Sequence, residues 1–94
     1  MLTLTDNAST VVEAIVRRND ETEHAGLRIE AENPDATDFG VTIVPLPEPR
    51  DAIVEQGGAR VYLDESATTA LSDKTLDASV DEKGRVAFNI LPQV

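Results

Sequence analysis

Few side chains in this sequence have the types and spacing that chemistry requires, and the first candidates surround its one histidine. His24 follows Glu21 and Glu23, and two carboxylates beside an imidazole can hold a metal ion weakly. A single histidine cannot supply a two-histidine site or a facial triad within one subunit. Carboxylates in loops are usually solvated, so we favour a solvated acidic loop at residues 21–24.

Asp35 and Asp38 form a second acidic pair. Carboxylate oxygens suit iron and other hard cations, so Asp35, Asp38 and His24 are the candidates for an oxygen-ligand metal site. Asp residues also build turns and cap helices, and that structural role explains the pair without a ligand. We therefore assign no catalytic, cofactor-binding or metal-binding residue and keep these three side chains as an alternative.

Other motifs that would indicate an activity are incomplete. The run Asp77-x-Ser79-x-Asp81 begins like a calcium loop, but Glu82 stands where that loop needs glycine and Phe88 where it needs glutamate. No serine lies in a G-x-S-x-G turn, and the five glycines form neither a dinucleotide nor a Walker pattern. Cysteine is absent, which removes disulfides, thiolate zinc sites and thiolate-held iron–sulfur clusters. The sequence predicts no enzyme and no bound cofactor.

Composition limits the partners. The 94 residues carry 18 Asp and Glu against 8 Lys and Arg, a net charge of −10. Such a surface repels phosphate backbones and anionic lipid head groups, so we expect neither nucleic acid nor membranes as partners. The length fits a single domain over residues 1–94. Because the first residues lack the basic start and apolar run of a signal peptide, we expect a cytoplasmic protein.

Hydrophobic periodicity predicts the elements that position these side chains. Apolar residues at helical spacing predict a helix over Asp6–Arg18, with Thr5 as its N-cap. Period-two alternation predicts strands at 27–32 and 39–44, and a proline-rich connector follows the second. The two apolar runs on either side of Gly57-Gly58 predict a hairpin.

The remaining third of the chain adds a short helix and a second hairpin. Asp64 is placed to cap the helix. The alternating runs 76–80 and 86–90 flank a turn at 81–84, and Phe88, the largest side chain on their inner faces, is expected to be buried. The elements together predict an α+β fold of short mixed and antiparallel strands with two helices.

Several short strings follow one another in an order that a known family shares: Leu2–Ala8, Gly26–Ile29, Asp51–Glu55 before Gly57-Gly58, Arg60–Asp64 and Leu76-Asp77. In this order and spacing, the sequence resembles the HesB-like family of A-type (IscA-like) iron–sulfur carriers. The resemblance spans nearly the whole chain. It implies a small HesB-like domain, in agreement with the elements that periodicity predicts.

The activity of that family depends on three cysteines, one in a Gly-Cys-Ser-Gly-like loop after the first strand and two in a Cys-Gly-Cys pair near the C-terminus. The resemblance places Ala36 where the loop cysteine would be, and Phe88–Val94 offers no counterpart of the pair. Thiolates hold the iron of such clusters, so cluster carriage does not transfer to this chain.

We therefore interpret the chain as a cysteine-free relative of these carriers. On this hypothesis it ligates no cluster and serves as an accessory or protein-interaction subunit, with a protein partner or as a homo-oligomer. The alternative hypothesis is a protein that binds iron or another hard cation through the oxygens of Asp35 and Asp38, together with His24.

Overall fold

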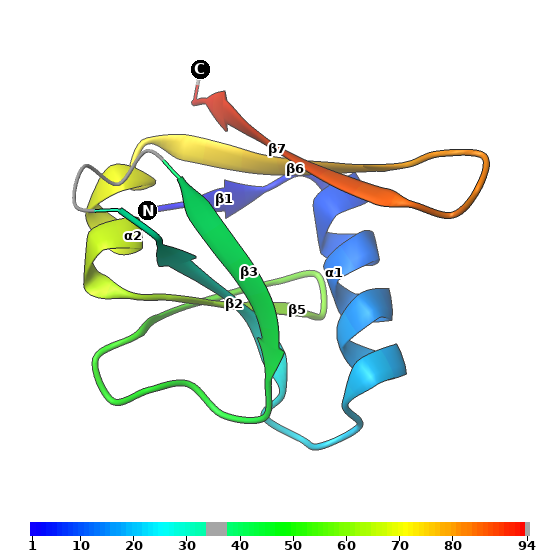
Figure 1. The fold of residues 1–94 in the computed structure, drawn as a ribbon, viewed down its shortest axis with the longest axis horizontal. Helices are drawn as coiled ribbons and strands as arrows, with labels where there is room; N and C mark the ends of the chain where they lie inside the picture. Colours follow the sequence, from blue (N-terminus) through cyan, green and yellow to red (C-terminus); the bar gives the residue numbers. More distant parts are fainter. Residues whose placement is uncertain (34–37, 94) are drawn as a thin grey trace.

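The computed structural model describes residues 1–33 and 38–93, which build two helices and two β-sheets (Figure 1). The elements in chain order are β1 (Thr3–Leu4), α1 (Asp6–Asn19), β2 (Gly26–Ala31), β3 (Phe39–Val44), β4 (Ala52–Gln56), β5 (Ala59–Leu63), α2 (Glu65–Ala70), β6 (Lys74–Val80) and β7 (Val86–Pro92). This arrangement confirms the predicted α+β class. No helix in the described ranges is long and apolar enough to cross a membrane.

Side-chain caps begin both helices at the residues that the sequence indicates. The Thr5 hydroxyl accepts a hydrogen bond of 3.0 Å from the backbone N–H of Ala8, and the Asp64 carboxylate accepts one of 2.7 Å from that of Ala67. Each bond satisfies an N–H that the first helical turn leaves without an intrahelical partner. The N-caps therefore fix where α1 and α2 begin.

The larger sheet has the strand order β3-β2-β5-β4. Strand β2 pairs antiparallel with β3 and parallel with β5, while β4 and β5 form the predicted antiparallel hairpin. The hairpin turn holds Gly57 and Gly58 at φ angles of +58° and +84°, a backbone region that glycine adopts without steric cost. Strand β3 is one edge of this sheet, and β4 is the other.

The smaller sheet has the order β1-β6-β7, with β1 parallel to β6 and β6 antiparallel to β7. The register of the β6–β7 hairpin pairs Leu76 with Ile90, Ala78 with Phe88 and Val80 with Val86. These are the inner-face residues that alternation predicts, so the second hairpin is confirmed.

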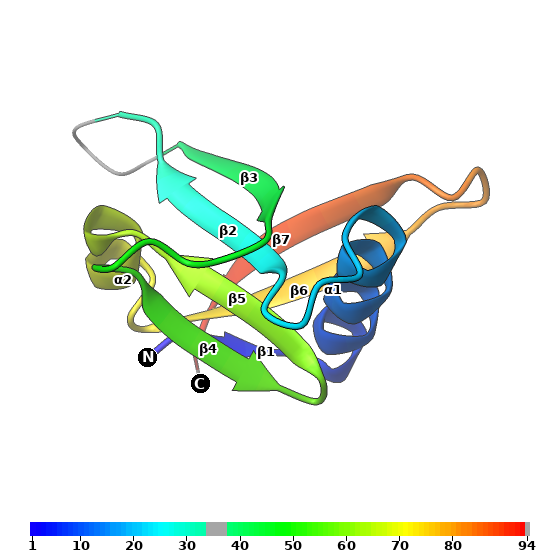
Figure 2. The same ribbon diagram turned by 90° about the horizontal axis from the view of Figure 1, so that it is seen from below.

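The core lies where the two sheets and α1 meet. Helix α1 packs against β5 and β6, and α2 packs against β2 and β5. Figure 2 shows α1 and α2 near opposite ends of the larger sheet's strands. The larger buried side chains are Leu2, Leu4, Val12, Val16, Leu27, Ile29, Val54, Val61, Tyr62, Leu63, Leu71 and Leu76.

One prediction about this core is wrong. Phe88 is half-buried, where the alternation predicts a buried side chain, and its neighbours on the same face, Val80, Val86 and Ile90, are exposed. The reason is that α1 packs against β6 and leaves the β7 side of the hairpin uncovered. The turn end of the hairpin also extends past the helix (Figure 1). Alternation identifies the inner face of a strand but not what covers it.

Candidate functional site

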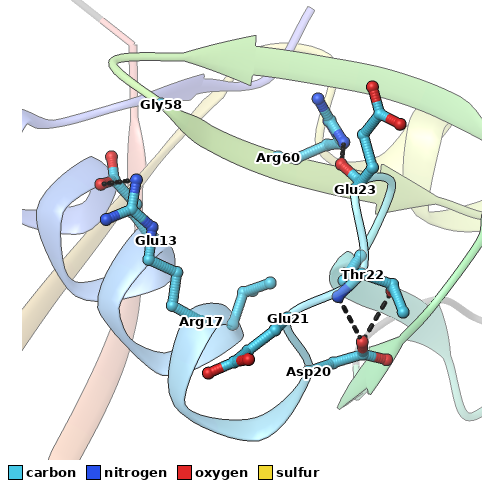
Figure 3. Close-up of a pocket in the computed structure, with 10 residues that line it drawn as sticks. Glu13, Arg17, Asp20, Glu21, Thr22, Glu23, Gly58 and Arg60 are labelled. Carbon is cyan, nitrogen blue, oxygen red and sulfur yellow. Dashed lines mark hydrogen bonds and ion pairs between the residues drawn. The ribbon is translucent and has the colours of Figure 1, made fainter.

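An acidic pocket of about 220 Å³ lies at the C-terminal end of α1, and its labelled side chains are drawn in Figure 3. It is bounded by the end of the helix, by the loop that follows it, and by the β4–β5 hairpin. The lining residues are Glu13, Val16, Arg17, Asp20, Glu21, Thr22, Glu23, Ala25, Gly58 and Arg60. The pocket therefore contains most of the acidic loop that the sequence singles out.

Arginines and local hydrogen bonds already occupy several polar groups of this pocket. Arg17 pairs with Glu13 at 3.2 Å, and the Arg60 guanidinium donates to the backbone carbonyl of Glu23 at 2.5 Å. The Thr22 hydroxyl and backbone N–H both donate to the Asp20 carboxylate and lower the pKa of Asp20. Glu13 and Asp20 therefore have separate partners within the pocket.

The acidic loop is held in place by its backbone. The Tyr62 hydroxyl donates a hydrogen bond of 2.5 Å to the backbone carbonyl of His24. His24 itself is exposed and does not line the pocket. In Figure 3 the carboxylates of Glu21 and Glu23 point to different sides. Across residues 1–33 and 38–93, no three His, Asp or Glu side chains are grouped so that they could hold a metal ion.

The structure separates the residues of the alternative metal hypothesis. Asp35 lies outside the described residues. His24 lies just before the start of β2. Asp38 lies just before β3, and the first residue of β3 pairs with the last residue of β2, so His24 and Asp38 are at opposite ends of β2. The six residues of β2 span about 20 Å at about 3.3 Å each, and an ion reaches its ligands over only about 2–2.6 Å. His24 and Asp38 of one chain therefore cannot share an ion.

Asp38 instead lies at an apolar groove of about 240 Å³ between the two sheets. Strands β2 and β3 form one wall, and β6 and β7 form the other. Apart from Asp38, the lining side chains are all apolar: Leu27, Ile29, Phe39, Val41, Leu76, Phe88 and Ile90. Because a groove of this kind binds through shape and apolar contact, it is the best candidate for a recognition site among the described residues.

The groove is open because an edge strand bounds it on each wall. Strand β3 ends the larger sheet and β7 ends the smaller one, so neither wall is continued by a further described strand. Leu27 and Leu76 at the base are buried, whereas Val41 is 43% exposed and Ile90 39% exposed. The cores of the two sheets thus meet at the base, and their apolar faces reach solvent along β3 and β7.

Neither of these edge strands contains a charged residue. Charged residues make up 28% of the sequence, yet Phe39–Val44 and Val86–Pro92 hold none. Exposed edge strands usually carry lysine or another charge that prevents pairing with a second chain. Both strands are predicted from the sequence, but this site is not, and the two charge-free runs are the signal that could have indicated it.

Comparisons with known proteins address the fold. No family model matches the sequence, and a search of curated proteins finds no match. Among solved structures, Escherichia coli SufA, described as involved in biosynthesis of iron–sulfur clusters, superposes with a TM-score of 0.75 at 20% identity, covering 97% of this chain and 84% of SufA. IscA, determined with a [2Fe-2S] cluster, gives 0.70 at 22%, covering 98% of this chain and 85% of IscA.

The chain has the fold of SufA and IscA. A protein from Aquifex aeolicus, solved by NMR, is also similar, with a TM-score of 0.71, 23% identity and coverage of 95% of this chain and 88% of that protein. The predicted HesB-like fold of the A-type carriers is thereby confirmed.

The cluster found in the IscA structure does not fit this chain. Iron–sulfur clusters are held by cysteine thiolates, with histidine replacing them in some sites. The sequence has no cysteine and one histidine, so it cannot supply such a ligand set. The fold is therefore shared with SufA and IscA, but the ligands for a cluster are missing.

Proposed function

We propose that this chain acts through protein–protein contacts as an accessory of iron–sulfur cluster assembly and does not itself hold a cluster. One combined observation carries the proposal: the chain has the fold of SufA and IscA, yet its sequence contains no cysteine. The fold supports a connection with cluster assembly, and the missing thiolates favour a role that needs no ligand.

The surface of the chain supports contact with proteins rather than catalysis. Among the described residues, Glu13 and Asp20 of the acidic pocket already have partners, while the groove between β3 and β7 is apolar and open. Apolar surface that remains accessible commonly marks an interaction site. We therefore assign the chain no enzymatic activity and propose that it acts in the cytoplasm. Its net charge of −10 favours protein partners over nucleic acid or membranes.

Anaerobic reconstitution with iron and sulfide tests the proposal. The chain should gain no visible absorption and no stoichiometric iron, because no thiolate is available to replace water on the iron. Purified SufA treated in parallel serves as the positive control. A brown protein with stoichiometric iron and sulfide would contradict the proposal.

A cysteine variant and a native preparation complete the test. Ala36→Cys restores one thiolate at the position indicated by the family resemblance, and it should also stay colourless because a cluster needs about four ligands. Protein purified natively from its own cells should contain a cluster-assembly protein in a stable complex. A monomeric chain that carries stoichiometric iron would overturn the assignment.

A further inference from the structure

The free edge of β3 has the properties of a site for an added strand. Its six residues pair with β2 on one side only, and they read Phe-Gly-Val-Thr-Ile-Val, with neither a charge nor a proline. The opposite edge of the same sheet, β4, contains Glu55, which is paired with Arg60. Charges and prolines on edges prevent pairing with other chains, and β3 has neither device.

The groove provides room for alternate side chains of such a strand. In β3, Phe39 and Val41 point into the groove, because alternate residues of a strand share a face. An extended segment beside β3 would present every second side chain to the same groove, opposite Phe88 and Ile90 of β7. Apolar residues at those positions would cover the surface that the two edges leave exposed.

The other face of β3 is acidic. The Glu32 side chain lies against Gly40, where a Cβ atom would collide with its carboxylate. Glu30 pairs with Gly40 in the register of β2 and β3, but its carboxylate already bonds Arg28 at 2.7 Å on the same face. Glu32 belongs to no ion pair among the described residues and is the acidic group left on this side. The intervening side chains of an added strand would face this side, so basic residues would complement it.

Charge also distinguishes a second copy of this chain from a basic segment as the partner of β3. A second copy of this chain would bring another net charge of −10 and a β3 strand without basic residues. Repulsion between the copies would oppose that pairing, whereas a basic segment would be attracted.

We propose that β3 binds an extended segment of a partner protein in which apolar residues alternate with lysine or arginine. The segment adds as a fifth strand to the larger sheet, with its apolar side chains in the groove and its basic side chains on the side of Glu32. This proposal rests on the proposed function, since it describes the partner of a chain that acts through protein contacts.

The probe is a fluorescent peptide of about eight residues that alternates valine with lysine, the usual length of a short strand. Fluorescence anisotropy measures its affinity for the full chain. A peptide with glutamate in place of lysine should bind at least about tenfold more weakly, a difference of 1.4 kcal/mol. A peptide with proline at its central valine should also lose affinity, because proline cannot complete the strand ladder.

Two matched pairs of variants locate the site on β3. Val41→Asn puts an amide in the groove and should weaken binding about tenfold, whereas Ile53→Asn, at a similarly exposed apolar residue of the opposite edge strand β4, should change affinity less than about threefold. Glu32→Gln should weaken binding and reduce its dependence on salt, while Glu65→Gln on α2 should change neither. Amide exchange should slow in β3 but not in β4 when the peptide binds.

Equal affinities of the Val41→Asn and Ile53→Asn variants, or equal binding of the lysine and glutamate peptides, would overturn the proposal. So would sedimentation showing a dimer of the wild-type chain that Val41→Asn dissociates, because the occupant would then be a second copy. If the peptide does not bind and the reconstituted protein stays colourless, strand addition is refuted but the proposed function is not. A reconstituted cluster would refute the proposed function whatever the peptide does.

Discussion

Arg28 and Asp51, 23 residues apart, form a two-bonded ion pair: Nε of Arg28 lies 2.9 Å from Oδ2 of Asp51, and Nη2 lies 3.0 Å from Oδ1. The Asp51 side chain is 2% exposed and that of Arg28 is 12% exposed. Arg28 also contacts the carboxylates of Glu30 and Glu48. The pair therefore fastens the proline-rich connector between β3 and β4 to the centre of β2.

Hydrogen bonding favours the charged form of both partners. The bonds from Arg28 lower the pKa of Asp51, and the backbone N–H of Glu48 adds to this effect, while burial opposes it. The bond to Asp51 likewise raises the pKa of Arg28 above its ordinary value. Asp51 is thus ionised at neutral pH despite its burial.

Removing Arg28 should destabilise the fold strongly. Arg28→Met leaves Asp51 buried without its partner and should lower the free energy of unfolding by about 3 kcal/mol. Arg50→Met is the matched control, because Arg50 is 83% exposed and its contact with Glu65 is 3.7 Å, so the loss should stay below about 0.5 kcal/mol. Urea denaturation at constant slope measures both. Equal losses would show that the Arg28 network contributes no more than a surface pair.

The pair should also make stability depend on pH in the acid range. Because the folded-state pKa of Asp51 is depressed, its contribution is fully present above the unfolded value of about 3.9 and is lost as the pH falls through the folded value. Asp51→Asn should therefore be clearly less stable than the wild type at pH 6, and the gap should narrow by pH 3. A gap that is constant from pH 6 to pH 3 would show that Asp51 has an ordinary pKa.

Local patterns predict most of this fold, because each depends on neighbours in the sequence. Thr5 and Asp64 cap the helices, and the glycine turns and alternating runs predict both hairpins. The parallel pairing of β2 with β5 was not predicted, since the pairing partner of a strand is set by tertiary contacts.

The site depends still more on tertiary arrangement. Alternation indicates that Val41 and Phe88 belong to inner faces, but only the packing of α1 against β6 shows that these faces stay open. From the sequence pattern, Arg28 is an ordinary outward-facing residue of an alternating strand. Its partner Asp51 is 23 residues away, so no local pattern indicates the pair. Long-range contacts of this kind leave no local pattern.

Gly26 should tolerate no side chain, for a steric reason. A Cβ atom there would lie 2.7 Å from the Tyr62 ring and 2.9 Å from the Arg60 backbone carbonyl, so Gly26→Ala should cost about 2–3 kcal/mol. Gly40→Ala is the control in the paired strand, because its new methyl group would meet only the flexible Glu32 side chain and should cost less than about 1 kcal/mol. Similar melting temperatures for both variants would contradict this contact.

Metal titration should distinguish the oxygen-ligand alternative. With His24 and Asp38 at opposite ends of β2, Fe²⁺ or Mn²⁺ should bind no tighter than about 1 mM, and equally to the wild type and to an Asp35→Ala, Asp38→Ala double variant. Salt should abolish the weak binding, since surface attraction is screened over about 8 Å at physiological ionic strength. Submillimolar, stoichiometric binding that the double variant loses would establish a metal site and weaken the accessory proposal.

The register pair Leu76 and Ile90 tests how far the core extends into the β6–β7 hairpin. The two side chains lie opposite each other on one face, but Leu76 is 2% exposed and Ile90 is 39% exposed. Leu76→Ala should therefore cost about 3 kcal/mol and Ile90→Ala about 1 kcal/mol, because a side chain that already contacts water leaves a smaller cavity. Phe88→Ala should fall between them, as its half-buried ring packs against the core. Urea midpoints at dilute protein concentration give the comparison. If Ile90→Ala cost as much as Leu76→Ala, and the cost grew with protein concentration, a second copy of the chain would already cover the groove.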